Sequence, residues 1–153
     1  MIQRIQTIYL LLATAIMATI HAIPLAQLTN NEGIWDFYSY GIISISGDTS
    51  VTIDTLPIAV IIALAAILSF IAIFGYKNRK RQVKIAMLSS MFTLLFYPIA
   101  LIYWWYSKDA VLATETSFNA IIIFPIVAFI LDIMAIRAIN ADERLVRSAD
   151  RIR

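Results

Sequence analysis

Asp132 is the residue of this sequence whose type and position best suit the binding of a proton or cation, or a buried hydrogen bond. It lies past the middle of a long apolar run near the C-terminus. Placing a carboxylate at such a depth in a bilayer costs about 2.5–3.5 kcal/mol on insertion scales. No basic residue lies at the same depth, so desolvation favours the neutral acid, which donates a hydrogen bond.

This acid has two uses that the sequence leaves open. In the first, Asp132 is a proton or cation site in a small transporter. In the second, it is a hydrogen-bonded link between helices or a contact to another subunit. A single acid without a second ionisable group at its depth forms no proton relay, so we favour the structural use.

Hydroxyl groups are the available partners for this acid. The other apolar runs offer hydroxyls at comparable depth on Thr14, Ser69, Ser89, Ser90 and Thr93. We combine Asp132 with four of them into one candidate intramembrane polar site, made by Asp132, Thr14, Ser69, Ser90 and Thr93. Ser90 and Thr93 share a helix face with Ala86 and Tyr97, which favours a polar stripe on that helix.

Other kinds of site have little support in the sequence. The chain has no cysteine, which excludes disulfides, Cys-ligated zinc, iron–sulfur clusters and cysteine nucleophiles. Its single histidine, His21, has only Glu32 and Asp36 of a loop as nearby acids, so we expect no metal site. No Ser/His/Asp set, Gly-rich phosphate loop or paired-carboxylate motif is present, and we expect neither enzyme activity nor a cofactor.

The elements that carry these residues are membrane spans. The composition is 61% hydrophobic and 14% charged, against roughly 25% charged residues in soluble domains. Four apolar runs are long enough to cross a bilayer as helices, at residues 5–23, 56–76, 85–106 and 118–139. We therefore predict an all-α integral membrane protein with a single four-helix transmembrane domain over residues 1–153. Its connections are an outer loop 24–55, a basic loop 77–84 and a tail 140–153.

Charge sets the predicted orientation. All but one of the 12 Lys and Arg residues lie in the N-terminus, in the loop 77–84 or from residue 137 onward, and the exception is Lys108. By the positive-inside rule, both termini and the basic loop are cytoplasmic. The basic residues of that loop are Lys77, Arg79, Lys80, Arg81 and Lys84. We interpret them as a topology signal and a contact for anionic lipids; the alternative is docking of an acidic partner or RNA.

Two further segments have a predicted shape. Residues 35–46 are rich in aromatic and β-branched residues, and Gly47–Asp48 offers a turn before a second candidate strand at residues 50–53. This pattern predicts a short hairpin over the outer helix ends; an irregular loop with aromatic residues at the headgroup level has equal weight. In the tail, an apolar stripe through Leu145 and Val146 predicts an amphipathic helix, on the inner leaflet or against the bundle.

The two ends of the chain resemble a known family. Residues 1–7 (MIQRIQT) and 141–153 (ADERLVRSADRIR) are similar to the terminal signatures of the bacterial "domain of unknown function 4293" family. The resemblance covers the whole chain. It implies four spans and the cytoplasmic (inner) membrane of Gram-negative bacteria, and it implies no activity and no functional residues.

Both signatures fall on the predicted cytoplasmic side. We hypothesise that polar residues of the N-terminus meet the acids of the tail and form one docking surface. The residues concerned are Gln3, Arg4, Gln6, Asp142, Glu143, Arg147 and Asp150.

The expected function is therefore interaction. We favour a non-enzymatic accessory subunit or assembly factor of a larger inner-membrane complex, with the bilayer, anionic lipids and a membrane protein as partners, and no DNA. The alternative is a small proton-coupled or cation transporter that uses Asp132. A third hypothesis is lipid binding by the basic loop and tail.

Overall fold

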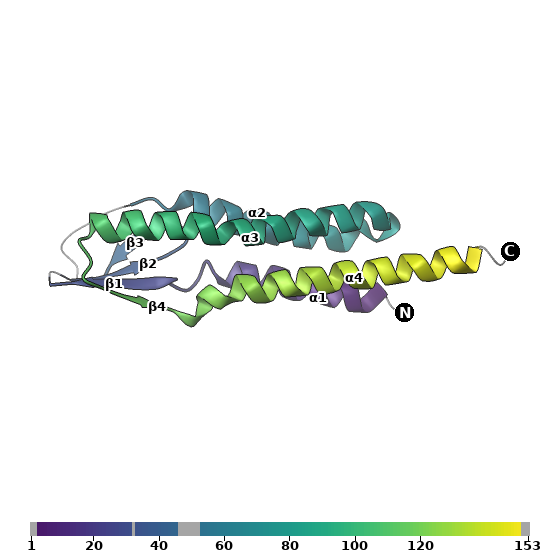
Figure 1. Cartoon of the computed structure of the whole chain (residues 1–153), viewed down its shortest axis with the longest axis horizontal. Helices are drawn as coiled ribbons and strands as arrows, with labels where there is room; N and C mark the ends of the chain where they lie inside the picture. Colours follow the sequence, from purple (N-terminus) through teal and green to yellow (C-terminus); the bar gives the residue numbers. More distant parts are fainter. Residues whose placement is uncertain (1–2, 32, 46–52, 151–153) are drawn as a thin grey trace.

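Four helices make up most of the molecule. The computed structural model of the chain describes residues 3–31, 33–45 and 53–150, and only the backbone at residues 3, 4, 77 and 147–150. The helices are α1 (Gln3–Thr19), α2 (Leu56–Phe74), α3 (Arg79–Ala110) and α4 (Phe124–Asp150), with short 3-10 helices η1 (Gly75–Lys77) and η2 (Ala120–Ile123). They run alternately up and down, so both termini lie at one end (Figure 1). Because α1 and α3 each pack against both α2 and α4, the four helices form a closed bundle.

Three of the helical segments are long and apolar enough to cross a membrane: α2, α3 and Ala120–Val146. The first helix is shorter than the predicted run 5–23, because α1 ends at Thr19. The next residues form tight turns, in which Ile20, His21 and Ala22 donate to the carbonyls three residues earlier. Pro24 follows and disfavours helical geometry in the residue before it.

The boundaries of the later helices correct the predicted basic loop and agree with the predicted helix in the tail. The basic segment 77–84 is not a loop, because α3 begins at Arg79. The Asn78 side chain accepts a hydrogen bond from the Arg81 amide at 3.2 Å and so caps the helix. Arg79, Lys80, Arg81 and Lys84 therefore lie in the first turns of α3. In the tail, residues 140–150 continue α4 without a break.

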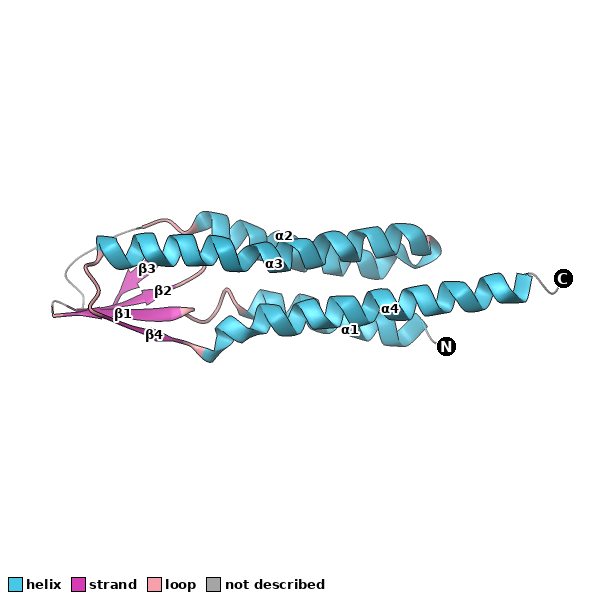
Figure 2. Cartoon of the chain, in the orientation of Figure 1, coloured by secondary structure: helices cyan, strands magenta, loops and turns pink. Residues whose placement is uncertain are grey.

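A four-stranded antiparallel sheet covers the end of the bundle opposite the termini (Figure 2). Its strands are β1 (Ala26–Asn30), β2 (Gly33–Phe37), β3 (Ile42–Ser44) and β4 (Glu115–Phe118), in the order β3-β2-β1-β4. The first three strands come from the segment between α1 and α2, and β4 comes from the segment between α3 and α4. The sheet therefore joins both connections at this end of the molecule.

This sheet differs from the predicted hairpin. The expected strand 35–46 is interrupted at Tyr38–Gly41, where the Tyr38 amide donates to the Gly41 carbonyl at 2.9 Å. Strands β1 and β4 were not predicted. Because of them, the protein is not all-α but consists of helices and a small sheet. The expected turn at Gly47–Asp48 and most of the strand 50–53 lie outside the described residues.

Small residues and alternating strand residues build the core. Leu28 of β1 and Trp35 and Phe37 of β2 point into the helices and are at most 2% exposed. Between the helices, alanines with no exposed surface allow close approach: Ala13, Ala65, Ala72, Ala86, Ala128 and Ala135. The apolar residues on the outer helix surfaces are exposed, as expected for helices that face lipid.

Candidate functional site

Asp132 lies in the centre of the bundle and joins three helices. Its side chain is on α4 and only 1% exposed. Ser69 of α2 donates a hydrogen bond to Asp132 Oδ1 at 3.0 Å, and the Ser89 hydroxyl of α3 lies 3.0 Å from Oδ2. Each carboxyl oxygen is thus held by a different helix.

The two serines also contact each other and the backbone. Ser69 Oγ and Ser89 Oγ are 2.7 Å apart, and Ser89 Oγ lies 2.9 Å from the Ala65 carbonyl. Asp132, Ser69 and Ser89, with the Ala65 carbonyl, are called the serine–aspartate cluster below. All its side chains are buried, so its hydrogen bonds are made inside the protein.

Counting hydrogens indicates the protonation state of the cluster. Four oxygen–oxygen contacts join it, and each serine supplies one hydrogen. A neutral Asp132 supplies a third: it donates to Ser89, Ser89 donates to Ala65, and Ser69 donates to Asp132. An ionised carboxylate supplies none and leaves two contacts without a hydrogen. The geometry therefore fits the neutral acid better.

Buried alanines bring the three helices together at this depth. On α4, Asp132 lies between Ala128 and Ala135; on α2, Ser69 lies between Ala65 and Ala72. Ala86 precedes Ser89 on α3 by one turn, and all five alanines have no exposed surface. Small neighbours let the backbones approach, so the short serine side chains reach the carboxyl group.

Only some residues of the candidate polar site contact one another in the structure. Asp132 and Ser69 are in contact, but three other hydroxyls bond to carbonyls of their own helices. Ser90 donates to Met87 at 2.8 Å, Thr93 to Ser89 at 3.1 Å, and Thr14 to Leu10 at 2.8 Å. Thr14 also lies 3.5 Å from the Ala66 carbonyl of α2, but none of these three hydroxyls contacts Asp132.

Ser89 is the residue that sequence reasoning left out of this site. The sequence places Ser89 among the hydroxyls at comparable depth, but the predicted polar stripe passes through Ser90. No sequence signal separates Ser89 from Ser90. In the structure, Ser89 belongs to the stripe Ala86, Ser89, Thr93 and Phe96, whose members are all at most 1% exposed. A stripe of fully buried residues faces the neighbouring helices more directly than one that includes the half-buried Tyr97.

The cluster has no charged partner within the described part of the chain. The contacts of Asp132 are hydroxyl oxygens, and its carboxyl group lines neither the cavity under the sheet nor the groove at the opposite end of the bundle. Such a carboxyl group can bind one proton, and its hydrogen bonds can link three helices.

An ion pair between the basic segment and the C-terminal signature lies at the far end of the bundle. Arg79 Nη2 lies 2.8 Å from Asp142 Oδ2, and Arg79 Nη1 donates to the Asp142 carbonyl at 3.2 Å. This pair ties the start of α3 to α4. Nearby, Lys80 and Glu143 line an open groove, and Gln6 is buried at 3% exposure.

The hypothesised docking surface is thus described in part. The side chains of Gln3, Arg4, Arg147 and Asp150 lie outside the described residues, as does that of Lys77. Lys80, Arg81 and Lys84 are exposed around the first turns of α3. Asp142, one of the acids expected to meet the N-terminus, pairs with Arg79.

His21 has a local structural contact. Its Nδ1 lies 2.9 Å from the Ser39 hydroxyl, which joins the end of α1 to the turn between β2 and β3. Among the described residues, no three His, Asp or Glu side chains gather where they could hold a metal ion.

Comparison with known proteins identifies the family. No curated protein matches the sequence. The family model described as "Domain of unknown function (DUF4293)" matches residues 2–152, nearly the whole chain, and the protein therefore belongs to that family.

Proposed function

We propose that the protein is a non-enzymatic accessory subunit or assembly partner of a larger complex in the bacterial inner membrane. The observation that carries the proposal is the serine–aspartate cluster, in which both oxygens of Asp132 are already bound by neighbouring helices. A buried acid held in this way stabilises the bundle. The surfaces open to other molecules are then the lipid-facing sides and the two ends.

The sheet end supports an interaction role. The strand order places β3 and β4 at the edges of the sheet. An edge strand presents unpaired backbone N–H and C=O groups, which can pair with a strand of another chain. At the other end, exposed basic residues at the start of α3 suit acidic headgroups or an acidic protein surface.

The membrane arrangement belongs to the same proposal. We place α1 in the membrane as a fourth span with both termini in the cytoplasm, because nearly all basic residues are at that end. The absence of cysteine from the chain makes the test direct: single cysteines at Asn31 and at Lys80 are treated with a membrane-impermeant maleimide in whole cells. Labelling of Asn31→Cys but not Lys80→Cys is expected, and the reverse pattern contradicts the orientation.

The second candidate is a small proton-coupled or cation transporter. One observation favours it: Asp132 with two serine hydroxyls forms an all-oxygen set inside a membrane-spanning bundle, and intramembrane acids commonly mark proton or ion pathways. In that case Asp132→Asn abolishes transport without loss of folding.

Affinity purification from native membranes tests the proposal. The protein is tagged at its C-terminus, extracted in mild detergent, and compared with Asp132→Asn and Ser90→Ala. Asparagine keeps the shape of the acid and can bond to both serines, so we expect a stoichiometric partner with all three proteins. Purification of the wild type alone, together with uptake in vesicles that Asp132→Asn removes, establishes the transporter instead.

A further inference from the structure

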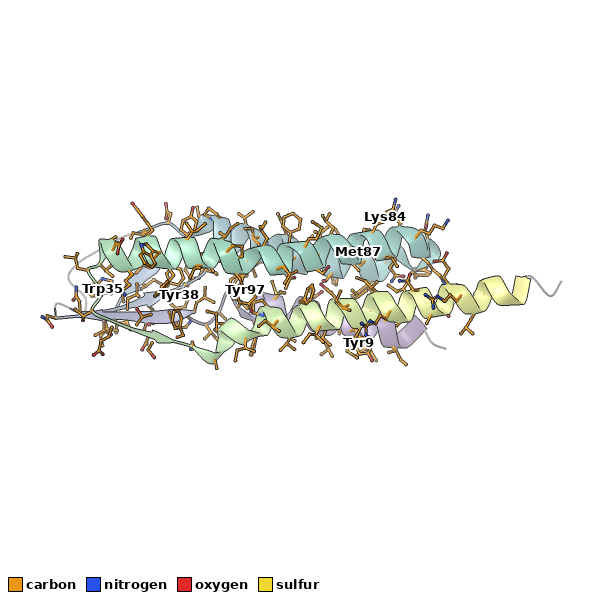
Figure 3. The ribbon with its side chains drawn as sticks, viewed as in Figure 1. Tyr9, Trp35, Tyr38, Lys84, Met87 and Tyr97 are labelled. Atoms are coloured by element: carbon orange, nitrogen blue, oxygen red, sulfur yellow. The ribbon has the colours of Figure 1, made fainter. Side chains whose placement is uncertain are left out.

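An apolar cavity lies between the sheet and the outer half of α3. Its volume is about 150 Å³, and its walls include Phe37 of β2, Tyr97, Ala100 and Trp104 of α3, and Phe118 of β4. Tyr97 lies between α3 and the sheet end of α4 (Figure 3), where its hydroxyl donates to the Ile122 carbonyl at 2.8 Å. A cavity of this size and lining accepts an apolar group about as large as a benzene ring.

The cavity opens onto the lipid-facing surface of the protein. Leu101 and Phe118 line it and are 60% and 53% exposed, so they form its mouth. Trp104 and Phe118 lie with ring centroids 5.4 Å apart and narrow the opening between α3 and β4. Since α3 is long and apolar enough to span a membrane, the molecules that meet this mouth are the acyl chains of the bilayer.

A single positive charge lies beside the cavity. Lys108 Nζ is 5.7 Å from the centroid of the Trp104 ring, one helical turn beyond the cavity wall. No other Lys or Arg occurs in residues 24–55 or 107–123, the two segments that build the sheet. Within the described part of the chain, Lys108 forms no ion pair, so its ammonium group is available to an external anion.

We propose that this cavity binds a short segment of one acyl chain of an anionic phospholipid whose phosphate pairs with Lys108. The apolar walls accept the chain, and the charge one turn away selects the headgroup. Aromatic residues are typical of the membrane interface, where a phosphate and the start of its chain lie close together. The inference concerns lipid alone and is independent of the protein partner proposed above.

Quenching of tryptophan fluorescence by brominated lipid tests the inference. The protein carries Trp35→Phe and Trp105→Phe, because Trp35 is not part of the cavity wall and Trp105 is 64% exposed and would meet any lipid. Of the three tryptophans in the sequence, Trp104 then remains and reports on the cavity. It is reconstituted into phosphatidylcholine vesicles that contain a minor share of phosphatidylglycerol, with bromine on the chains of one lipid or the other. We expect brominated phosphatidylglycerol to quench with about fivefold preference, as one basic residue near a surface provides.

Two variants with matched controls make the test specific. Lys108→Gln removes the preference for phosphatidylglycerol, whereas Lys84→Gln at the opposite end of α3 keeps it (Figure 3). Ala100→Phe fills the cavity and reduces quenching by both lipids, whereas Ala18→Phe on the exposed surface of α1 does not. If circular dichroism shows that Ala100→Phe does not fold, the comparison of Lys108→Gln with Lys84→Gln still tests the proposal. Equal quenching by both lipids, or a preference that survives Lys108→Gln, overturns the proposal.

Discussion

The hydroxyl oxygens of Ser69 and Ser89 lie 2.7 Å apart, and each also contacts a different oxygen of the same aspartate. This triangle links α2, α3 and α4 in the middle of the bundle. Helix association in a membrane has no help from the exclusion of water, so packing and buried polar contacts of this kind decide which helices are neighbours.

The first prediction concerns Ser89. Ser89→Ala removes the hydroxyl that bonds to Asp132 and Ala65, and leaves the buried Oδ2 of Asp132 without its partner at a cost of about 1–3 kcal/mol. Ser90→Ala is the matched control, because the Ser90 hydroxyl bonds only to Met87 of its own helix. We expect a clear drop in the thermal unfolding midpoint in detergent for Ser89→Ala and a small one for Ser90→Ala. Equal drops would show that the cluster adds no stability of its own.

The second prediction concerns the proton on Asp132. With a neutral Asp132, three of the four contacts in the cluster have a hydrogen, whereas with an ionised Asp132 only two have one. The infrared spectrum of the reconstituted protein at neutral pH should therefore contain the C=O band of a protonated carboxylic acid. Asp132→Asn should abolish this band, and Asp109→Asn, at an exposed acid on α3, should leave it. A spectrum with no such band at neutral pH is the contrary result.

The third prediction concerns the ion pair between Arg79 and Asp142. The pair joins α3 to α4 at 2.8 Å, with side chains 22% and 13% exposed. For a pair at this exposure, a double-mutant cycle with Arg79→Gln and Asp142→Asn should give a coupling of about 0.2–1 kcal/mol. The coupling should decrease with salt. Additive single effects at low salt would mean that the two residues do not stabilise each other.

The fourth prediction concerns Asn30. Its Nδ2 donates to the Val111 carbonyl at 2.7 Å, and its Oδ1 accepts from the Gly33 amide at 3.0 Å. One side chain therefore holds both the β1–β2 turn and the end of α3. Asn30→Ala should speed hydrogen exchange of the amides in residues 26–37, because local opening there becomes easier. The exposed neighbour Asn31 provides the control, and exchange that is equally slow in Asn30→Ala and Asn31→Ala would refute the role.

The helices could be predicted from sequence because the signal is local. Runs of apolar residues between charged segments locate α2, α3 and α4, and no long-range information is needed. The boundaries were less accurate because capping decides them. The polar Asn78 begins α3 within the basic segment, and lysine and arginine, which indicated a loop by charge, are also good helix formers.

The sheet and the cluster depend on contacts between distant residues. Thr29 of β1 pairs with Glu115 of β4, and nothing near either residue signals the other. Strands as short as Glu115–Phe118 have little pattern of their own, and their stability comes from cross-strand pairs. Similarly, Ser89 and Ser90 differ by one residue in sequence, but that step rotates the side chain about 100° around the helix. Only packing determines which hydroxyl meets Asp132.

The pairing of β1 with β4 has a consequence for biogenesis. The ribosome makes β1 before α2 and α3, and β4 after them, so β1 has an unpaired edge until the chain has passed through both helices. A nascent or truncated protein that stops after α3 exposes this edge, which is an aggregation-prone feature. The sheet can therefore be completed only after both intervening helices have been made.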